Sequence, residues 1–238
     1  MKRYRSADCS IRRKFTPLNK CKEFLKLAKS GNLIPVYREI LADFETPLSA
    51  YSKIDPGEYS FLLESVEGGQ RLARYSFLGG SPSVVFSSKG KRIEIREGAA
   101  ARVFEADDPI KELEKLFARY KVVKVKGLPR FTGGLVGFFG YDMVRFIEDI
   151  PDKNRDTLKS PDSVFMLTDT ILIFDHVDHK IKVVSNAYIK DSASGSYDEA
   201  VRKIDLIVKG LGGGHHKKEA KPIPIKHGAT TINLKSNF

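Results

Sequence analysis

The chain contains 238 residues, 41% of them apolar, and carries a formal net charge of +11. This length suits one large domain, or one domain with a piece of another, and it is long enough to bury a core. The longest apolar stretch, residues 163–174, is shorter than a membrane span and contains Asp169. We therefore expect a protein without a membrane partner.

The positive charge is spread along the sequence. A surplus of positive charge of this size can favour binding to nucleic acids or to anionic membranes. The aromatic residues fall mostly at core-periodic positions, not beside basic residues, so a basic nucleic-acid-binding β protein is the least favoured alternative. The one dense basic block lies in residues 1–15, which we interpret as an N-terminal tail. It lacks the apolar stretch of a secretory signal.

The first part of the chain predicts helices separated by short strands. A threonine followed by proline, as at 16–17 and 46–47, is typical of a helix start. Alternating apolar and polar residues predict strands. The expected elements are a helix over 16–31, a strand over 33–40, a short helix from 46, strands over 59–66 and 74–79, and a hairpin over 83–98.

The second part of the chain continues this mixture. Asp108 and Pro109 open a helix with a single apolar stripe, and the capping box from Ser196 to Glu199 opens another. The expected elements are the helix from 108, a strand that turns into a short helix over 133–147, a hairpin over 164–189 with its turn at 175–180, and the helix from 196.

Short turns join most of these strands, so their pairing should be mainly antiparallel. We therefore predict an α+β fold with mainly antiparallel sheets and helices packed outside. Residues 16–209 form the expected domain. The glycine-rich and charged composition of residues 210–224 predicts a linker, and residues 225–238 look like the start of a further domain.

The strand over 59–66 ends on Glu64 and Ser65 after an apolar run. One interpretation is that the strand has reached the surface. The other is that both side chains border a closed polar hollow, since a carboxylate accepts from a ligand ammonium group and a hydroxyl hydrogen-bonds beside it. Arg71 or Arg74 could then meet a ligand carboxylate. Such a set complements a zwitterionic amino acid.

Two other candidates are rejected on spacing. The glycines of residues 133–148 match neither phosphate-binding fingerprint, because Gly140 is followed by tyrosine and aspartate. Close backbone packing is the favoured interpretation. His176 and His179 sit in a turn, His215 and His216 sit in the linker, and Cys9 and Cys21 are the only cysteines, so no metal site or disulfide framework is expected. Scarce cysteines predict a reducing cytoplasm.

Several segments together resemble one family. They include 32-NLIPVYREILADFETPLSAYSKI-54, 61-FLLESVEGG-69, 74-RYSFLG-79, 133-GGLVGFFGYDMVR-145 and 171-ILIFDHVDHKIKVV-184. In this order they resemble the N-terminal region of anthranilate synthase component I, the large subunit, which makes anthranilate from chorismate in tryptophan biosynthesis. Aminodeoxychorismate synthase component I shares these elements and is a near alternative.

The resemblance implies a role for the end of the second strand. In that family this strand lines a pocket for tryptophan, the feedback inhibitor, so Ser65 and Glu64 are expected to bind tryptophan, with Arg74 as a basic neighbour. The resemblance also implies that the chorismate site, the Mg²⁺ ligands and the acid–base residues belong to a chorismate-binding half that begins near residues 225–238. This chain alone is then expected to be inactive.

The resemblance implies further partners for the complete enzyme, which is a lyase. A glutamine amidotransferase subunit, component II, supplies the ammonia, and the chorismate-binding half belongs to the same subunit. An alternative of a different class is a stand-alone amino-acid-binding module. The sequence itself leaves both interpretations open.

Overall fold

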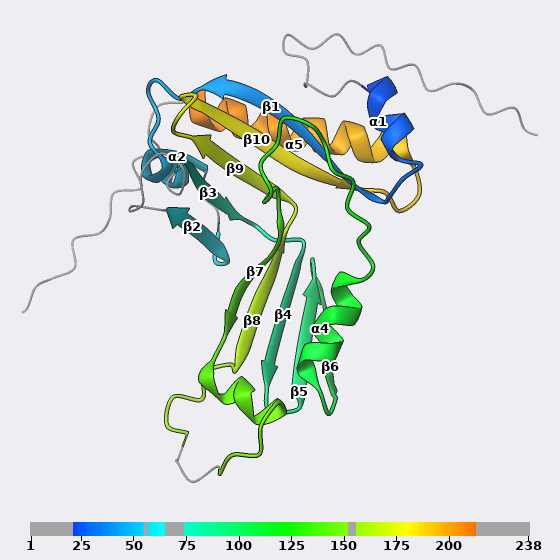
Figure 1. The fold of residues 1–238 in the computed structure, drawn as a ribbon, viewed down its shortest axis with the longest axis vertical. Helices are drawn as coiled ribbons and strands as arrows, with labels where there is room; N and C mark the ends of the chain where they lie inside the picture. Colours follow the sequence, from blue (N-terminus) through cyan, green and yellow to red (C-terminus); the bar gives the residue numbers. More distant parts are fainter. Residues whose placement is uncertain (1–20, 55–56, 65–73, 152–155, 213–238) are drawn as a thin grey trace, which may run out of the picture.

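The computed structural model describes residues 21–54, 57–64, 74–151 and 156–212. They form two five-stranded antiparallel sheets, one above the other along the long axis of the molecule (Figure 1). This confirms the predicted α+β class. Sheet A has the order β1-β10-β9-β3-β2, and sheet B has the order β6-β5-β4-β8-β7.

The strands of sheet A are β1 (Leu33–Leu41), β2 (Ser60–Glu64), β3 (Tyr75–Gly80), β9 (Thr170–Asp175) and β10 (Lys180–Tyr188). Those of sheet B are β4 (Val84–Lys89), β5 (Arg92–Glu97), β6 (Ala100–Glu105), β7 (Gly134–Phe139) and β8 (Ser163–Thr168). The helices are α1 (Cys21–Leu27), α2 (Pro47–Ile54), α4 (Pro109–Phe117), α5 (Ala193–Gly212) and the 3₁₀-helix η1 (Tyr141–Phe146).

Helix α5 lies along one face of sheet A (Figure 1). Its apolar residues, Val201 and Ile204 among them, share a core with Ile181 and Val183 of β10. Helices α1 and α2 add to the same core, for example through Phe24, which is completely buried. Burial of this stripe removes apolar surface from water and fixes the helix on the sheet.

Helix α4 covers sheet B in the same way. Leu113 and Leu116 pack against Phe86 and Ile93 of the sheet. The helix begins as the sequence predicted, because the Asp108 carboxylate accepts the backbone N–H groups of residues 110 and 111 at 3.0 and 3.1 Å. None of the helices within the described residues is long and apolar enough to cross a membrane.

The predicted hairpin over 164–189 is wrong in its first arm. Residues 163–168 are β8 of sheet B, whereas β9 and β10 form the hairpin in sheet A. The chain passes between the sheets at Asp169, whose carbonyl accepts the backbone N–H of Asn186 at 2.6 Å. Strands β8 and β9 are both apolar and rich in β-branched residues, so the sequence pattern is the same on the two sides of the crossing. Asp169 is the one residue that interrupts it.

Three other boundaries differ from the prediction. Strand β6 was not expected, because its mostly exposed residues lack a buried face. Helix α5 begins at Ala193, not Ser196: the Ser192 hydroxyl accepts the Gly195 N–H, while the Ser196 hydroxyl bonds the Tyr188 carbonyl. The helix also continues to Gly212, so the first three residues of the predicted linker are helical. Residues 1–20 and 213–238, with the tail and the rest of the linker, lie outside the described residues.

The glycine-rich segment forms β7 and then η1, as predicted. Gly137 faces the backbone of β8, where an added Cβ atom would collide with the Val164 carbonyl oxygen and come within 2.7 Å of the Phe165 Cα atom. Close backbone approach is therefore the reason for this glycine. Phe138 and Phe139 are each about half exposed, because β7 is an edge strand of sheet B.

Substitution of Gly137 tests this packing. Gly137→Ala should lower the free energy of unfolding by about 2 kcal/mol, because neither backbone atom in contact can move aside cheaply. The matched control is Gly210→Ala in α5, where an added Cβ atom meets nothing within 4 Å. That change should stabilise the helix by about 0.5 kcal/mol. Urea unfolding followed by circular dichroism measures both, and equal effects would contradict the packing argument.

Candidate functional site

Glu64 is the last residue of β2 and is solvent-exposed. It pairs with Ser76 of β3, two residues from the pair of Leu62 and Leu78 that packs in the α5-side core. Because side chains alternate along a strand, Glu64 and Ser76 project to that same face. The described residues leave Glu64 exposed, but residues 65–73, which follow it, lie outside them, so the expected hollow stays a prediction. Ser65 and Arg71 lie outside the described residues.

A polar row extends from Glu64 across sheet A. The buried Ser76 hydroxyl is 2.7 Å from Nε2 of His176, a residue that directly follows β9. The backbone N–H of His176 donates to the Arg74 carbonyl at 2.9 Å, which holds the imidazole at this sheet end. Glu64, Ser76 and His176 therefore place a carboxylate, a hydroxyl and an imidazole along one face.

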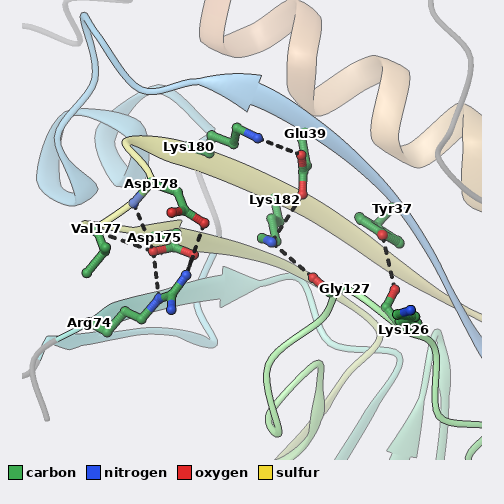
Figure 2. Close-up of polar contacts among 10 residues, drawn as sticks. All are labelled: Tyr37, Glu39, Arg74, Lys126, Gly127, Asp175, Val177, Asp178, Lys180 and Lys182. Carbon is green, nitrogen blue, oxygen red and sulfur yellow. Dashed lines mark hydrogen bonds and ion pairs between the residues drawn. The ribbon is translucent and has the colours of Figure 1, made fainter. Parts of the chain in front are cut away.

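Arg74 lies on the other face. Its guanidinium donates to both carboxylate oxygens of Asp175, at 2.9 and 2.7 Å, and to Asp178 at 3.0 Å (Figure 2). Asp175 pairs with Tyr75, the residue next to Ser76, so it projects away from the face of Glu64. The structure thus does not bring Arg74 and Glu64 together. Two carboxylates within the chain already balance the charge of Arg74.

Asp175 is the buried centre of this ion cluster, with a side chain that is fully shielded from solvent. Burial acts to raise the pKa of Asp175, but the Arg74 hydrogen bonds and the N–H groups of Asp178 and Val177 hold that pKa below its ordinary value. The same contacts raise the pKa of Arg74. The cluster fixes the turn between β9 and β10 (Figure 2).

A second ion cluster lies further along the same face (Figure 2). Glu39 of β1 meets Lys182 at 3.1 Å and Lys180 at 3.2 Å, both on β10. Burial acts to raise the pKa of Glu39, but hydrogen bonds from these two lysines hold that pKa below its usual range. The cluster joins the neighbouring strands β1 and β10.

The second cluster also anchors the segment before β7. The largely buried Lys182 donates to the Gly127 carbonyl at 3.0 Å, and the Tyr37 hydroxyl donates to the Lys126 carbonyl at 3.2 Å. Burial raises the pKa of Tyr37, with a further contribution from Glu39. These contacts place Leu128 and Phe131 against the core on this face. The contacts of Lys182 and Tyr37 therefore position the segment before β7.

Sequence reasoning missed Ser76 and His176 as neighbours of Glu64. The only signal for them is the strand register, which requires β2, β3 and β9 to lie side by side. His176 had been set aside because no metal site could be assembled around it. In the described part of the chain, no group of three or more His, Cys, Asp or Glu residues could hold a metal ion.

Comparison with known proteins gives the class. The family model described as "chorismate binding enzyme" matches residues 58–235, and the chain belongs to this family. Among curated relatives, anthranilate synthase component 1 of Acetivibrio thermocellus is 37% identical over 181 residues, which is 76% of this chain and 37% of that protein. The Pseudomonas putida protein of the same name is 42% identical over 166 residues, covering 68% of this chain and 34% of its own length.

A solved structure agrees with these relatives. The crystal structure of anthranilate synthase component I from Streptococcus pneumoniae TIGR4 matches with a TM-score of 0.50 and 26% identity, covering 74% of this chain and 37% of that chain. The chain is thus similar to anthranilate synthase component I in both sequence and fold. It spans between 34% and 42% of the length of the curated relatives described by that name.

Replacement of the buried carboxylate should change the acid stability. The pKa of Asp175 is lower in the folded chain than in the unfolded one, so its stabilising contribution is present above about pH 4 and is lost as pH falls through the lowered value. Asp175→Asn should destabilise by about 1–3 kcal/mol at neutral pH. The free energy of unfolding of the variant should also fall less steeply as the pH decreases below about 4, because the wild-type carboxylate loses its contribution in that range.

Urea unfolding at a series of pH values measures this effect. The matched control is Asp43→Asn, because Asp43 is an exposed carboxylate without a hydrogen bond to the described residues. The control should leave the stability at neutral pH unchanged. An acid dependence that Asp175→Asn leaves intact would contradict the assigned ion cluster.

Proposed function

We propose that this chain is the N-terminal, tryptophan-binding regulatory part of an anthranilate synthase component I. The complete enzyme converts chorismate and ammonia to anthranilate and pyruvate. The similarity to relatives of that name supports the enzyme class. Aminodeoxychorismate synthase remains the near alternative within the same family, since it shares the motifs of the strands.

The polar end of β2 carries the proposal of an amino-acid effector. Glu64 is exposed and makes no hydrogen bond with the described residues, so its carboxylate is available to an ammonium group. Ser65 follows it directly, and the Ser76 hydroxyl and His176 imidazole continue the polar row. Arg74 contributes indirectly: its carbonyl and its guanidinium hold the turn after β9, on which His176 sits.

Regulation would follow from the thermodynamic linkage between effector binding and the arrangement of the protein. An effector that binds one arrangement of the protein more tightly than another shifts the population by that difference in affinity. The proposed site comprises the end of β2 and the turn joining β9 to β10, which the strand pairing brings near each other. A bound amino acid would therefore connect an edge strand of sheet A with its central hairpin.

The proposed catalytic half would need a surface on which to pack. Strand β7 offers one, because it is an edge strand and its Phe138 and Phe139 are about half exposed. Tyr141, at the start of η1, is 84% exposed. Exposed aromatic side chains beside an edge strand are typical of a covered interface, although Phe138 and Phe139 project to opposite faces of the sheet. The glutamine amidotransferase subunit is the second proposed partner and supplies ammonia.

Magnesium belongs to the proposed complete enzyme. The described residues include no cluster of carboxylates and histidines that fits a metal ion, so no step of the reaction is assigned to Mg²⁺ on this chain. The resemblance places the Mg²⁺ ligands and the acid–base residues in the chorismate-binding half. Following this resemblance, the function proposed for these 238 residues is recognition, and the chemistry is assigned to the chorismate-binding half.

Calorimetry with L-tryptophan tests the effector site. Ser65→Ala and Glu64→Ala should each weaken binding about tenfold, because each removes a hydrogen bond, in the case of Glu64 a charge-assisted one. The matched control is Glu58→Ala, an exposed carboxylate that precedes the same strand. Affinity that is unchanged in both site variants would refute the assignment of residues 64 and 65.

An activity assay tests the proposed absence of chemistry. The isolated chain, given chorismate, ammonia and Mg²⁺, should release no anthranilate detectable by its fluorescence. The positive control is anthranilate synthase component 1 of Acetivibrio thermocellus under the same conditions. Anthranilate production by the 238-residue chain would overturn the proposal that catalysis belongs to the chorismate-binding half.

A further inference from the structure

A cavity of about 630 Å³ lies where the two sheets meet. The end of β10, the start of α5, the chain crossing at Asp169, the start of β4 and the segment after α4 all contribute to its lining. Its volume falls within the range of small-molecule sites. Glu64 and Arg74 are not among its described lining residues, so it is distinct from the proposed effector site.

The lining is acidic in a basic protein. The chain has 41 basic and 30 acidic residues, yet four carboxylates and only two lysines line the cavity. The N-terminus of α5 adds about half a positive charge, and Arg119 pairs with Glu97 at 3.3 Å, so only about half a negative charge is left over. The charged lining residues are Glu97, Asp169, Lys190, Asp191, Glu199 and Lys203.

Lys203 is already neutralised within the chain. Its Nζ atom lies 2.8 Å from Asp169 and 3.3 Å from Glu199. Burial acts to lower the pKa of Lys203, but the hydrogen bond to Asp169 holds that pKa above its usual value. In contrast, Asp191 has no hydrogen bond or ion pair with the described residues. This exposed carboxylate is thus the lining group that is available to a ligand cation.

Aromatic rings and free hydroxyls complete the lining. The rings of Tyr120 and Tyr188 lie side by side with their centroids 4.8 Å apart, and neither hydroxyl bonds a described residue. Burial raises the pKa of Tyr120, with contributions from Tyr188 and from the lining carboxylates Glu97 and Asp169. Thr168 also lines the cavity, and its buried hydroxyl oxygen has no hydrogen-bond partner in the described part of the chain.

We propose that this cavity binds a small arylalkyl ammonium ion. The ammonium group would donate to Asp191 and to the tyrosine hydroxyls. The Tyr120 face would also attract its charge, whereas the Nζ atom of Lys190 already lies 5.7 Å from the Tyr188 ring centroid. The aromatic body would pack against the Tyr120 and Tyr188 rings. An anion of the same body would meet the Asp191 carboxylate, since the other three lining carboxylates are paired within the chain. A neutral analogue would lose the attraction to Asp191 and to the Tyr120 face. The inference goes beyond the proposed function and does not depend on tryptophan binding at residues 64 and 65.

The test compares three ligands of equal shape on the 238-residue chain. Phenethylamine, phenethyl alcohol and hydrocinnamate carry a positive, a neutral and a negative group on the same body. Phenethylamine should bind at millimolar concentration or better, and at least about fivefold more tightly than the alcohol. Hydrocinnamate should bind most weakly, although the net charge of +11 would favour anions at unspecific sites. Amide chemical shifts in NMR spectra give both affinity and location.

Single-residue variants test whether phenethylamine binds in the cavity. Asp191→Asn should weaken phenethylamine binding about fivefold and leave the alcohol unchanged. Tyr188→Leu should weaken it by a similar factor, about fivefold, because the aromatic body loses the ring on which it packs. The same amide spectrum checks the fold. The matched control is Asp198→Asn, an exposed carboxylate of α5 outside the described lining, which should have no effect. Equal binding of amine and alcohol, no binding of any ligand, or equal losses in the two aspartate variants would each overturn the proposal.

Discussion

Asn186 holds the two sheets together where the chain passes between them. Its backbone N–H and its side-chain amide both donate to the Asp169 carbonyl, at 2.6 and 3.2 Å, and the side chain also donates to the Thr132 carbonyl at 2.7 Å. Gly133 is required beside it, because an added Cβ atom would collide with the Asn186 amide nitrogen. One buried amide therefore joins β10, the chain crossing and the segment before β7, and the mutual position of sheets A and B depends on it.

The turn after β9 depends on a comparable local constraint. The buried Asp175 carboxylate accepts from Arg74 and from backbone N–H groups of the turn, so the turn has one geometry. His176 and the buried Ser76 hydroxyl are placed by that geometry, and Glu64 lies next to them on the neighbouring strand. Arg74 thus fixes the structure behind the proposed effector site from the opposite face of the sheet.

The sequence predicted elements best where a single residue decides the local structure. Asp108 caps α4, and the Thr46 hydroxyl accepts the Ser49 N–H at 3.1 Å at the start of α2, because these side chains satisfy free N–H groups without help from the rest of the fold. The site was harder to predict. Glu64 and Arg74 were expected at one pocket, yet their faces depend on the pairing of β2, β3 and β9, which local patterns do not encode. Ser65 stays a prediction.

The sequence by itself determined the α+β class, the hairpin of β4 and β5, the helix starts after Thr46 and Asp108 and the likeness to one family. These features depend on interactions between residues close along the chain. Only the tertiary structure decided that β8 belongs to sheet B, that Arg74 is held by Asp175, and that a cavity lies between Tyr188 and the crossing at Asp169. Each of these three features depends on contacts between residues that are distant in sequence. The hydrophobic pattern of a strand is the same whichever strand it pairs with, so the pattern does not identify the partner.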